Sequence, residues 1–271
     1  MTLTGANTLM GLPTGQYDGH CHVFRADLPM AEDRRYTPDY DAKPEELCSL
    51  LKAFNLDGAL MVQPSFLGAD NSYLLQVLAD YASNDTVTFK GVAVLDPAMP
   101  VDSGWLRELD ERGIVGVRLN LLRKAPAFDY ETWRQTLAAV EKMGWHIELH
   151  SEAEHLPQLL PQLTRHHAKV VVDHFGLVGD INGSSGLRAI LDQPEDRLWI
   201  KVSGAYRIHP DADRSADADT MAPLRHIYSE HFGENRLIWG SDWPFTQFED
   251  RMSYCLARSV ALQSGHSMKA G

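Results

Sequence analysis

Short apolar runs alternate with longer amphipathic stretches along almost the whole chain. Runs such as GALMVQ, KVVVD and LIWG carry few polar residues. Strands of this composition are buried on both faces, as the strands of a parallel sheet are. The pattern predicts eight strands, over residues 17–24, 58–63, 88–95, 116–121, 146–150, 169–173, 198–202 and 237–240.

The segments between these runs have the apolar spacing of helices. The first of them begins with Pro44 followed by two glutamates, which is typical of a helix start. Gly113, Gly144 and Gly233 stand where helices are expected to stop. We predict helices over residues 44–55, 71–83, 103–113, 130–144, 156–167, 186–192 and 222–233, with an eighth over 249–263.

The strict alternation of strands and helices predicts an α/β fold in which helices cover a parallel sheet. Eight such units in 271 residues favour a single (β/α)8 TIM barrel, which typically spans about 250 residues. The alternative is an open doubly wound sheet. It is disfavoured because no glycine-rich phosphate-binding loop follows the first strand, and the glycines of GANTLMGLPTG precede it.

The ends of the chain differ in composition from the barrel. Residues 1–15 are small and polar and are predicted to form a loosely held N-terminal arm, with residues 16–271 as the barrel. Residues 209–220 are strongly acidic and are expected to be a solvated loop before a helix. Because the chain ends in ALQSGHSMKAG, the last barrel helix is expected to be shortened.

The composition restricts the partners of the protein. Its formal net charge of −12 gives no general reason to bind nucleic acid or an anionic membrane. No stretch approaches 18 apolar residues, and no signal peptide is recognisable. Cys21, Cys48 and Cys255 are too widely spaced to suggest a disulfide framework or a CxxC zinc site. We expect a cytoplasmic protein, monomeric or homodimeric, without nucleic-acid or membrane partners.

Polar residues gather where the predicted strands end. These ends read DGHCH, VQPS, VLDP, VRLN, IELH, VVDH, KVSG and GSDW. In a barrel enzyme the working residues lie at the C-terminal ends of the strands. The pattern therefore predicts an active site at this end of the barrel.

Four histidines and one aspartate are the strongest candidates for this site: His20, His22, His150, His174 and Asp242. His20 and His22 are two residues apart on a strand, so both side chains point to one face and can bind a metal or polarise a carbonyl oxygen. Asp242 follows an apolar strand and is interpreted as a general base or a metal ligand. By alternation, Cys21 and Asp173 are expected to point away from the interior, as structural residues.

With these residues in place, the chain resembles a known family. DGHCH, ELH, DHFG and WGSDWP match, in order, the landmarks of the amidohydrolase superfamily, which are HxH on strand one, a histidine on strands five and six, and an aspartate on strand eight. VQPSFLGADNSYLL, GVRLNL, KVSGAYR and LIWGSDWPFTQFE look like its lactonase branch, which includes 2-pyrone-4,6-dicarboxylate lactonases and sugar-acid lactonases. The similarity covers roughly residues 16–250.

The resemblance implies a hydrolase of aromatic catabolism that opens a carboxylated lactone. Asp242 would take a proton from water, while His20, His22 and His174 donate hydrogen bonds to the developing oxyanion. Arginines that follow strands would hold substrate carboxylates, because a guanidinium matches a carboxylate with two parallel hydrogen bonds. The candidate substrate-binding residues are Arg118, Arg123 or its neighbour Lys124, Arg207, His150, Ser65 and Tyr206.

The same resemblance leaves two expectations about a metal. The fourth strand ends in Arg118 and Asn120, without a Lys or Glu to bridge two ions. The pyrone-dicarboxylate lactonases lack that ligand too and are thought to work without metal, so our first expectation is that no cofactor is required. His150, however, stands where their pattern has a tyrosine. The alternative is one zinc or manganese ion, held by His20, His22, His150 and Asp242.

Other functions also fit the sequence. The barrel could be a mononuclear-metal decarboxylase of an aromatic acid, or a lactone isomerase. The products distinguish these reactions, because ring opening, carbon dioxide release and a shifted ring are different outcomes. An inactive barrel that serves as a binding protein is a third alternative, and the intact set of four histidines and one aspartate argues against it.

Overall fold

Eight parallel strands form one sheet in the computed structural model, which describes residues 4–99, 102–123, 128–214 and 217–262. The strands pair in chain order from first to last, so the predicted (β/α)8 barrel is confirmed. They are β1 (Tyr17–Cys21), β2 (Gly58–Val62), β3 (Thr88–Ala93), β4 (Ile114–Asn120), β5 (His146–His150), β6 (Val170–Val172), β7 (Leu198–Val202) and β8 (Leu237–Trp239).

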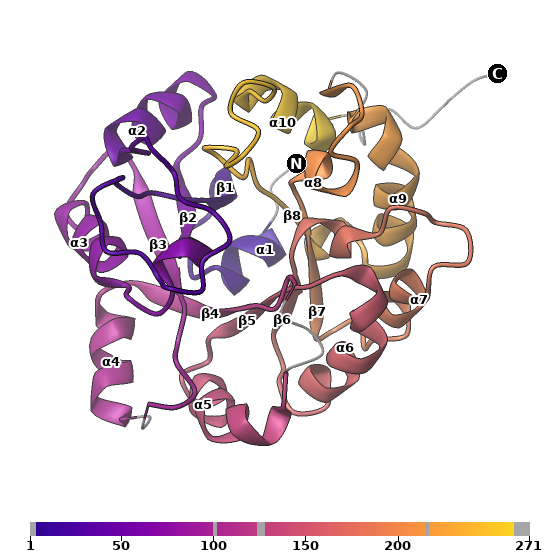
Figure 1. The fold of residues 1–271 in the computed structure, drawn as a ribbon, viewed down its shortest axis with the longest axis horizontal. Coiled ribbons are helices and arrows are strands. Elements are labelled where there is room, and N and C mark those ends of the chain that lie inside the picture. Colours follow the sequence, from indigo (N-terminus) through magenta and orange to yellow (C-terminus); the bar gives the residue numbers. More distant parts are fainter. Residues whose placement is uncertain (1–3, 100–101, 124–127, 215–216, 263–271) are drawn as a thin grey trace.

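Helices surround the strands as an outer ring (Figure 1). The helices of the described residues are α1 (Thr4–Leu9), α2 (Pro44–Ala53), α3 (Ser72–Asp80), α4 (Ser103–Glu111), α5 (Tyr130–Lys142), α6 (Leu156–Thr164), α7 (Ser185–Leu191), α8 (Ala205–Ile208), α9 (Asp217–Phe232) and α10 (Tyr254–Leu262). Single 3₁₀ turns add η1 (Ser65–Leu67), η2 (Ala153–His155), η3 (His174–Leu177) and η5 (Glu234–Arg236). In the described residues, no helix is both long enough and apolar enough to cross a bilayer.

The seam between the first and last strands is closed by residues that follow β8. The backbone N–H of Asp242 donates to the carbonyl oxygen of His20 over 2.8 Å, and the N–H of His22 donates to that of Trp243 over 2.8 Å. Cys21 and Trp243 form a parallel bridge at the same place. The closure of the barrel therefore sets Asp242 directly beside both histidines of the HxH pair.

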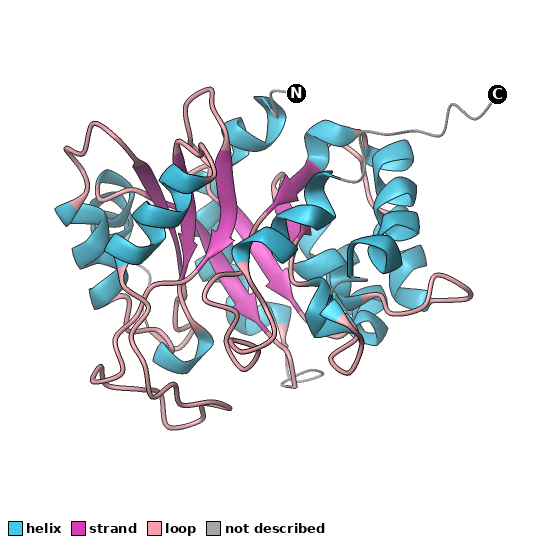
Figure 2. Cartoon of the chain, turned by 90° about the horizontal axis from the view of Figure 1, so that it is seen from above, coloured by secondary structure: helices cyan, strands magenta, loops and turns pink. Residues whose placement is uncertain are grey.

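The N-terminal segment closes the other end of the barrel, which differs from the loosely held arm that the sequence suggested. Leu9 and Met10 are buried and pack with apolar side chains from the barrel interior, among them Leu60 and Trp199. Figure 2 shows the helix beside the N-terminus at one end of the strands and the long loops at the other. The expectation failed because a few apolar residues within a polar segment suffice to plug a narrow barrel.

The last third of the chain departs from the expected helix bounds. The predicted helix over 222–233 starts five residues earlier, at Asp217, whereas α10 starts only at Tyr254 because residues 242–252 form turns above the site. Within the acidic segment 209–220, residues 210–213 are exposed as expected. Arg214 and Asp217 are instead buried, with Arg214 Nη1 lying 3.6 Å from Asp217 Oδ2.

Candidate active site

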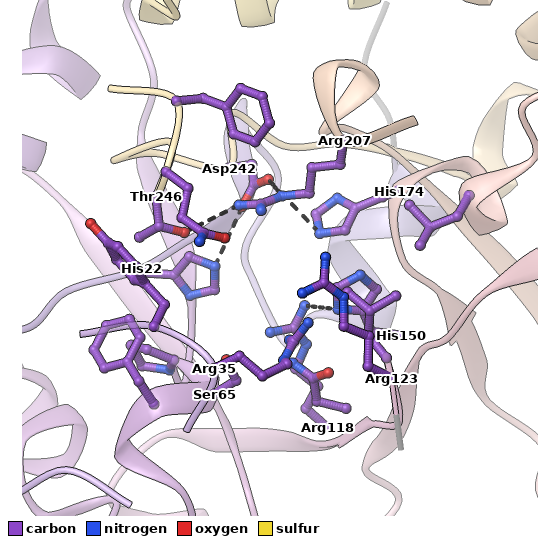
Figure 3. Close-up of a pocket in the computed structure, with 18 of the residues that line it drawn as sticks. His22, Arg35, Ser65, Arg118, Arg123, His150, His174, Arg207, Asp242 and Thr246 are labelled. Atoms are coloured by element: carbon purple, nitrogen blue, oxygen red, sulfur yellow. Dashed lines mark hydrogen bonds and ion pairs between the residues drawn. The ribbon is translucent and has the colours of Figure 1, made fainter. Parts of the chain in front are cut away.

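A cavity of about 480 Å³ opens at the C-terminal ends of the barrel strands. Its floor carries His22, His174 and Asp242, and its walls carry arginines from β4, from α8 and from two loops (Figure 3). His150 and Ser65 also line it. The structure thus brings most of the predicted site residues around one cavity.

Asp242 is fully buried at the floor, and its two carboxylate oxygens have different surroundings. Oδ2 accepts a hydrogen bond from the Tyr206 hydroxyl over 2.8 Å and one from Nε of Arg207. Oδ1 has no hydrogen-bond partner and faces Nε2 of His22 at 3.4 Å and Nε2 of His20 at 3.8 Å. Burial alone would raise the pKa of Asp242, but Arg207 and His174 hold it well below its usual range. Asp242 is therefore a carboxylate at neutral pH with one oxygen free.

The two histidines of the HxH pair are held by different partners. His22 lies just after β1, and its Nδ1 is 2.7 Å from the carbonyl oxygen of Val62. A ring nitrogen so close to a carbonyl must carry a hydrogen, and in the neutral form of the imidazole the lone pair is then on Nε2. His20, inside β1, instead has Nδ1 2.9 Å from the Lys201 ammonium. Burial and Lys201 lower the pKa of His20 well below its usual value.

His174 reaches the same floor from a strained turn after β6. Its φ of 51° and the φ of 54° at Phe175 lie in the left-handed region that side chains rarely adopt. Such strain is found where a surrounding structure holds functional residues in place. His174 Nδ1 lies 2.9 Å from the Ser203 hydroxyl, and Nε2 lies 3.9 Å from Oδ2 of Asp242. Burial lowers the pKa of His174 to about 4, so the ring is neutral at pH 7.

Asp173 faces the barrel interior, so the expectation that it points outward was wrong. It is buried, and its Oδ2 accepts a hydrogen bond from Nε of Arg118 at 2.9 Å and forms an ion pair with Nη2 of the same side chain at 2.8 Å. The strand period explains its direction, because Val171 points into the interior and Asp173 follows two residues later. His174 also turns inward because its left-handed backbone breaks the alternation. Although burial favours the neutral acid, Arg118 and Lys201 hold the pKa of Asp173 well below its usual range.

His150 lines the cavity at the end of β5, beside Arg118. Nη2 of Arg118 lies 3.2 Å from Nδ1 of His150, and a guanidinium can only donate, so Nδ1 accepts. Nε2 of His150 then carries the hydrogen, and it is buried without a partner. Burial and Arg118 lower the pKa of His150 well below its usual value. His150 is placed as a neutral donor at the cavity wall.

Four arginines line the cavity: Arg35, Arg118, Arg123 and Arg207. Three of them were candidates from the sequence, and Lys124, the alternative to Arg123, lies outside the described residues. Tyr206, expected to touch substrate, does not line the cavity. Its buried hydroxyl donates to Asp242, and its ring packs against Phe245 and Phe248.

Sequence reasoning missed three residues that the structure places at or beneath the site. Arg35 comes from the long loop between β1 and α2, which has no periodic pattern to signal it. Lys201 and Glu148 are fully buried in the barrel interior and form an ion pair. A signal for this pair existed, because charged residues within apolar strands are almost never buried unless they are paired. Cys21, in contrast, is buried in the apolar layer as expected.

Two groups of described residues come close enough to hold a metal ion: His20, His22 and Asp242, and His20, Asp173 and His174. His150 belongs to neither group. The unpartnered atoms His20 Nε2 and Asp242 Oδ1 fit such a role, and His22 has the backbone partner that metal-binding histidines use. His20 does not fit, because its second nitrogen faces an ammonium instead of a carboxylate or carbonyl. Both groups need His20, so the donor set is incomplete as it stands.

Curated proteins of known name resemble the chain over most of its length. It is 29% identical over 246 residues to 4-sulfomuconolactone hydrolase of Rhizobium radiobacter, covering 88% of this chain and 79% of the relative. It is also 29% identical over 253 residues to 2-pyrone-4,6-dicarboxylate hydrolase of Comamonas testosteroni, covering 89% and 80%. Each match thus covers nearly nine tenths of this chain and about four fifths of the relative.

A solved structure and a family model agree with these matches. A probable 2-pyrone-4,6-dicarboxylic acid hydrolase from Acinetobacter baumannii, solved with citric acid bound, superposes with a TM-score of 0.82 at 35% identity, covering 92% of this chain and 91% of that one. The family model described as amidohydrolase matches residues 17–266. That range contains every site residue described above, and the chain therefore belongs to the amidohydrolase family.

Proposed function

We propose that the protein hydrolyses a lactone that carries carboxylate groups, of the 2-pyrone-4,6-dicarboxylate kind. One observation carries the proposal: Oδ1 of Asp242, charged and unpartnered, lies within 4 Å of Nε2 of both His20 and His22 beneath an arginine-lined cavity. The names of the relatives, which are hydrolases of a pyrone dicarboxylate and of a sulfonated muconolactone, support the same substrate class.

In the proposed reaction, Asp242 is the general base. Its Oδ1 takes a proton from water while the water oxygen bonds to the carbonyl carbon of the lactone. The bond between that carbon and the ring oxygen then breaks, and Asp242 returns the proton to the ring oxygen as it leaves. The product is the open-chain acid with a free hydroxyl or its keto form, so the reaction adds one water.

The histidines are proposed to have two different roles, one in holding the water and one in stabilising the oxyanion. Nε2 of His22 has a lone pair and lies 3.4 Å from Oδ1 of Asp242, so one water on the cavity side can donate a hydrogen bond to both acceptors. This role differs from the hydrogen-bond donor expected of His22. His174, which lines the cavity, and His20, which is fully buried directly behind it, are proposed to donate through Nε2 to the oxygen that becomes negative as water attacks. Preorganised donors of this kind are typically worth about 10²- to 10³-fold in turnover.

The arginines are proposed to bind the carboxylates of the substrate. Arg118 and Arg207 already pair with Asp173 and Asp242, so they are fixed in direction before substrate enters. Arg35 has no hydrogen bond or ion pair to any described residue, and its pKa is lowered by burial and by Arg123 and Arg118. Several arginines close together in one cavity favour the binding of an anionic substrate, despite the net charge of −12 on the whole protein. The cavity thus suits a small dianion.

We also propose that the reaction needs no metal, since the partner of His20 is unsuited to a metal ligand. The test uses metal-stripped protein with 2-pyrone-4,6-dicarboxylate and identifies the product by mass spectrometry. The proposal predicts a product heavier by one water. Loss of carbon dioxide would indicate a decarboxylase, and a product of unchanged mass with a shifted ring would indicate an isomerase. Either result, or unaltered substrate, contradicts the proposal.

A further inference from the structure

A buried ion pair lies directly beneath the site without lining its cavity. Lys201 of β7 and Glu148 of β5 are both completely buried, and Nζ of Lys201 donates a short hydrogen bond to Oε1 of Glu148. The same Nζ lies 2.9 Å from Nδ1 of His20. Removing two opposite charges from water is costly and is often neutral or unfavourable for stability. Such a pair in the barrel interior therefore calls for a role other than packing.

The contact decides which nitrogen of His20 carries a hydrogen. An ammonium has three donors and no acceptor, so a nitrogen 2.9 Å away must accept from it. The acceptor is Nδ1, and the hydrogen of the neutral ring is then on Nε2. Oδ1 of Asp173 is the other group near Nδ1, but at 3.6 Å it is too far to form a hydrogen bond that competes.

His22, two residues along, has the opposite arrangement. Its Nδ1 donates to the carbonyl oxygen of Val62, so its Nε2 has the lone pair. Both Nε2 atoms point at Oδ1 of Asp242, one with a hydrogen and the other without. The HxH pair thus presents one donor and one acceptor to the same carboxylate oxygen. A pair of metal ligands would present two lone pairs instead.

We propose that Lys201, held in place by Glu148, is a positioning residue that fixes His20 with its hydrogen on Nε2. In this form His20 donates a hydrogen bond into the site and cannot bind a metal through Nε2. The step in which it stabilises the lactone oxyanion rests on the proposed function. The assignment of the hydrogen does not, because it follows from contacts within the barrel.

The first test reads the tautomer directly. Metal-stripped protein labelled with ¹⁵N in its histidine rings is measured by long-range ¹H–¹⁵N correlation, and the His20 signals are assigned with His20→Gln. The proposal predicts a protonated Nε2 and a bare Nδ1 for His20, with the reverse for His22 as an internal comparison. A His20 ring with its hydrogen on Nδ1, or on both nitrogens, overturns the proposal whatever the substrate is.

The second test removes the ion pair while keeping the charge balanced. Lys201→Met combined with Glu148→Gln leaves no uncompensated buried charge. Nδ1 of His20 is then free to carry a hydrogen, and Asp173 is beside it to accept. Zinc binding, measured by titration with zinc ions alone, is expected to tighten by about tenfold or more. Lys169→Met is the control and should not change the zinc affinity, because among the described residues Lys169 bonds only the Gly144 carbonyl.

Unchanged zinc affinity in the double variant contradicts the proposal. If the double variant does not fold, the ring spectrum of the unsubstituted protein still decides it. Failure of the lactone to react in the product analysis, with the predicted tautomer present, would overturn the proposed function and leave the role of Lys201 standing.

Discussion

Gly204 lies so close to His174 that only a glycine fits at position 204. A Cβ on Gly204 would stand 2.6 Å from Nδ1 of His174 and 3.1 Å from Oδ2 of Asp242. Real Cβ atoms do not approach other atoms to 2.6 Å, so any side chain must push the imidazole away. The turn after β7 therefore sets the spacing of the two groups at the floor of the cavity.

Gly204→Ala should reduce turnover by about a hundredfold, the scale expected when catalytic groups move by about 1 Å. Gly183→Ala is a matched control, because both glycines have positive φ, 59° and 78°, yet nothing lies within 4 Å of a Cβ at Gly183. The control should cost about 1–2 kcal/mol of stability from backbone strain alone and keep its activity. Equal turnover of the two variants, measured with folded protein, would contradict this account.

Arg35 should contribute to substrate affinity and not to turnover. It lines the cavity and, within the described residues, has no hydrogen-bond or ion-pair partner to lose. Arg35→Met should raise KM by about ten- to a hundredfold, the loss expected for a hydrogen-bonded charge, with kcat little changed. Arg165→Met, at an exposed position after α6, is the control. An unaltered KM for a dicarboxylate lactone would show that Arg35 does not contact it.

Acid should destabilise the protein through its buried histidines. The pKa of His174 is lowered from 6.5 to about 4 in the folded state, and those of His20 and His150 are lowered as well. Between pH 6.5 and pH 4 the unfolded chain binds protons that the folded protein does not. The contribution of these neutral histidines to the free energy of unfolding is therefore fully present above pH 6.5 and is lost as the pH falls toward 4. His174 alone should cost about 2 kcal/mol between pH 7 and pH 5.

Chemical denaturation of metal-stripped protein at the two pH values measures this loss. His174→Asn should reduce the difference between pH 7 and pH 5 by the His174 share. A free energy of unfolding that is the same at both pH values would mean that these histidines take up protons as readily in the folded protein as in the unfolded chain.

The N-terminal segment that closes one end of the barrel should be part of the folded core. Met10 is 2% exposed and packs against apolar residues of the barrel interior, whereas Met99 is 64% exposed. Met10→Ala should destabilise the protein by about 2–5 kcal/mol, as other large-to-small core substitutions do. Met99→Ala should stay within about 0.5 kcal/mol of the parent. Equal midpoints of thermal unfolding for the two variants would mean that the segment is dispensable.

The barrel could be predicted because its strands are nearly continuous apolar runs and their ends carry polar residues. β5 and β7 have the predicted bounds, and β8 differs by one residue. Counting alternation from His174 gave the wrong direction for Asp173, since the left-handed backbone at His174 breaks the alternation and places two consecutive side chains in the interior. Arg35 lies in a loop, where no periodicity links sequence to position.

The roles of the site residues depended on contacts that no spacing reveals. Tyr206 and Arg207 are adjacent in the sequence, yet only Arg207 lines the cavity. Lys201 lies in the run LWIKVSG, and its position in a buried strand indicates that it needs an acidic partner. Which acid that is, and that His20 shares the ammonium, required the geometry of the closed barrel.

The central claim is that Asp242 acts as the base in opening a carboxylated lactone. The most direct measurement compares the rate of 2-pyrone-4,6-dicarboxylate hydrolysis, followed by the loss of the ring absorbance, for the parent, Asp242→Asn and Asp192→Asn. Asp192 is an exposed carboxylate at the end of α7. The account predicts that Asp242→Asn stays folded and loses about 10²- to 10⁴-fold in kcat, while Asp192→Asn keeps the parent rate. A folded Asp242→Asn protein with near-parent turnover would contradict it.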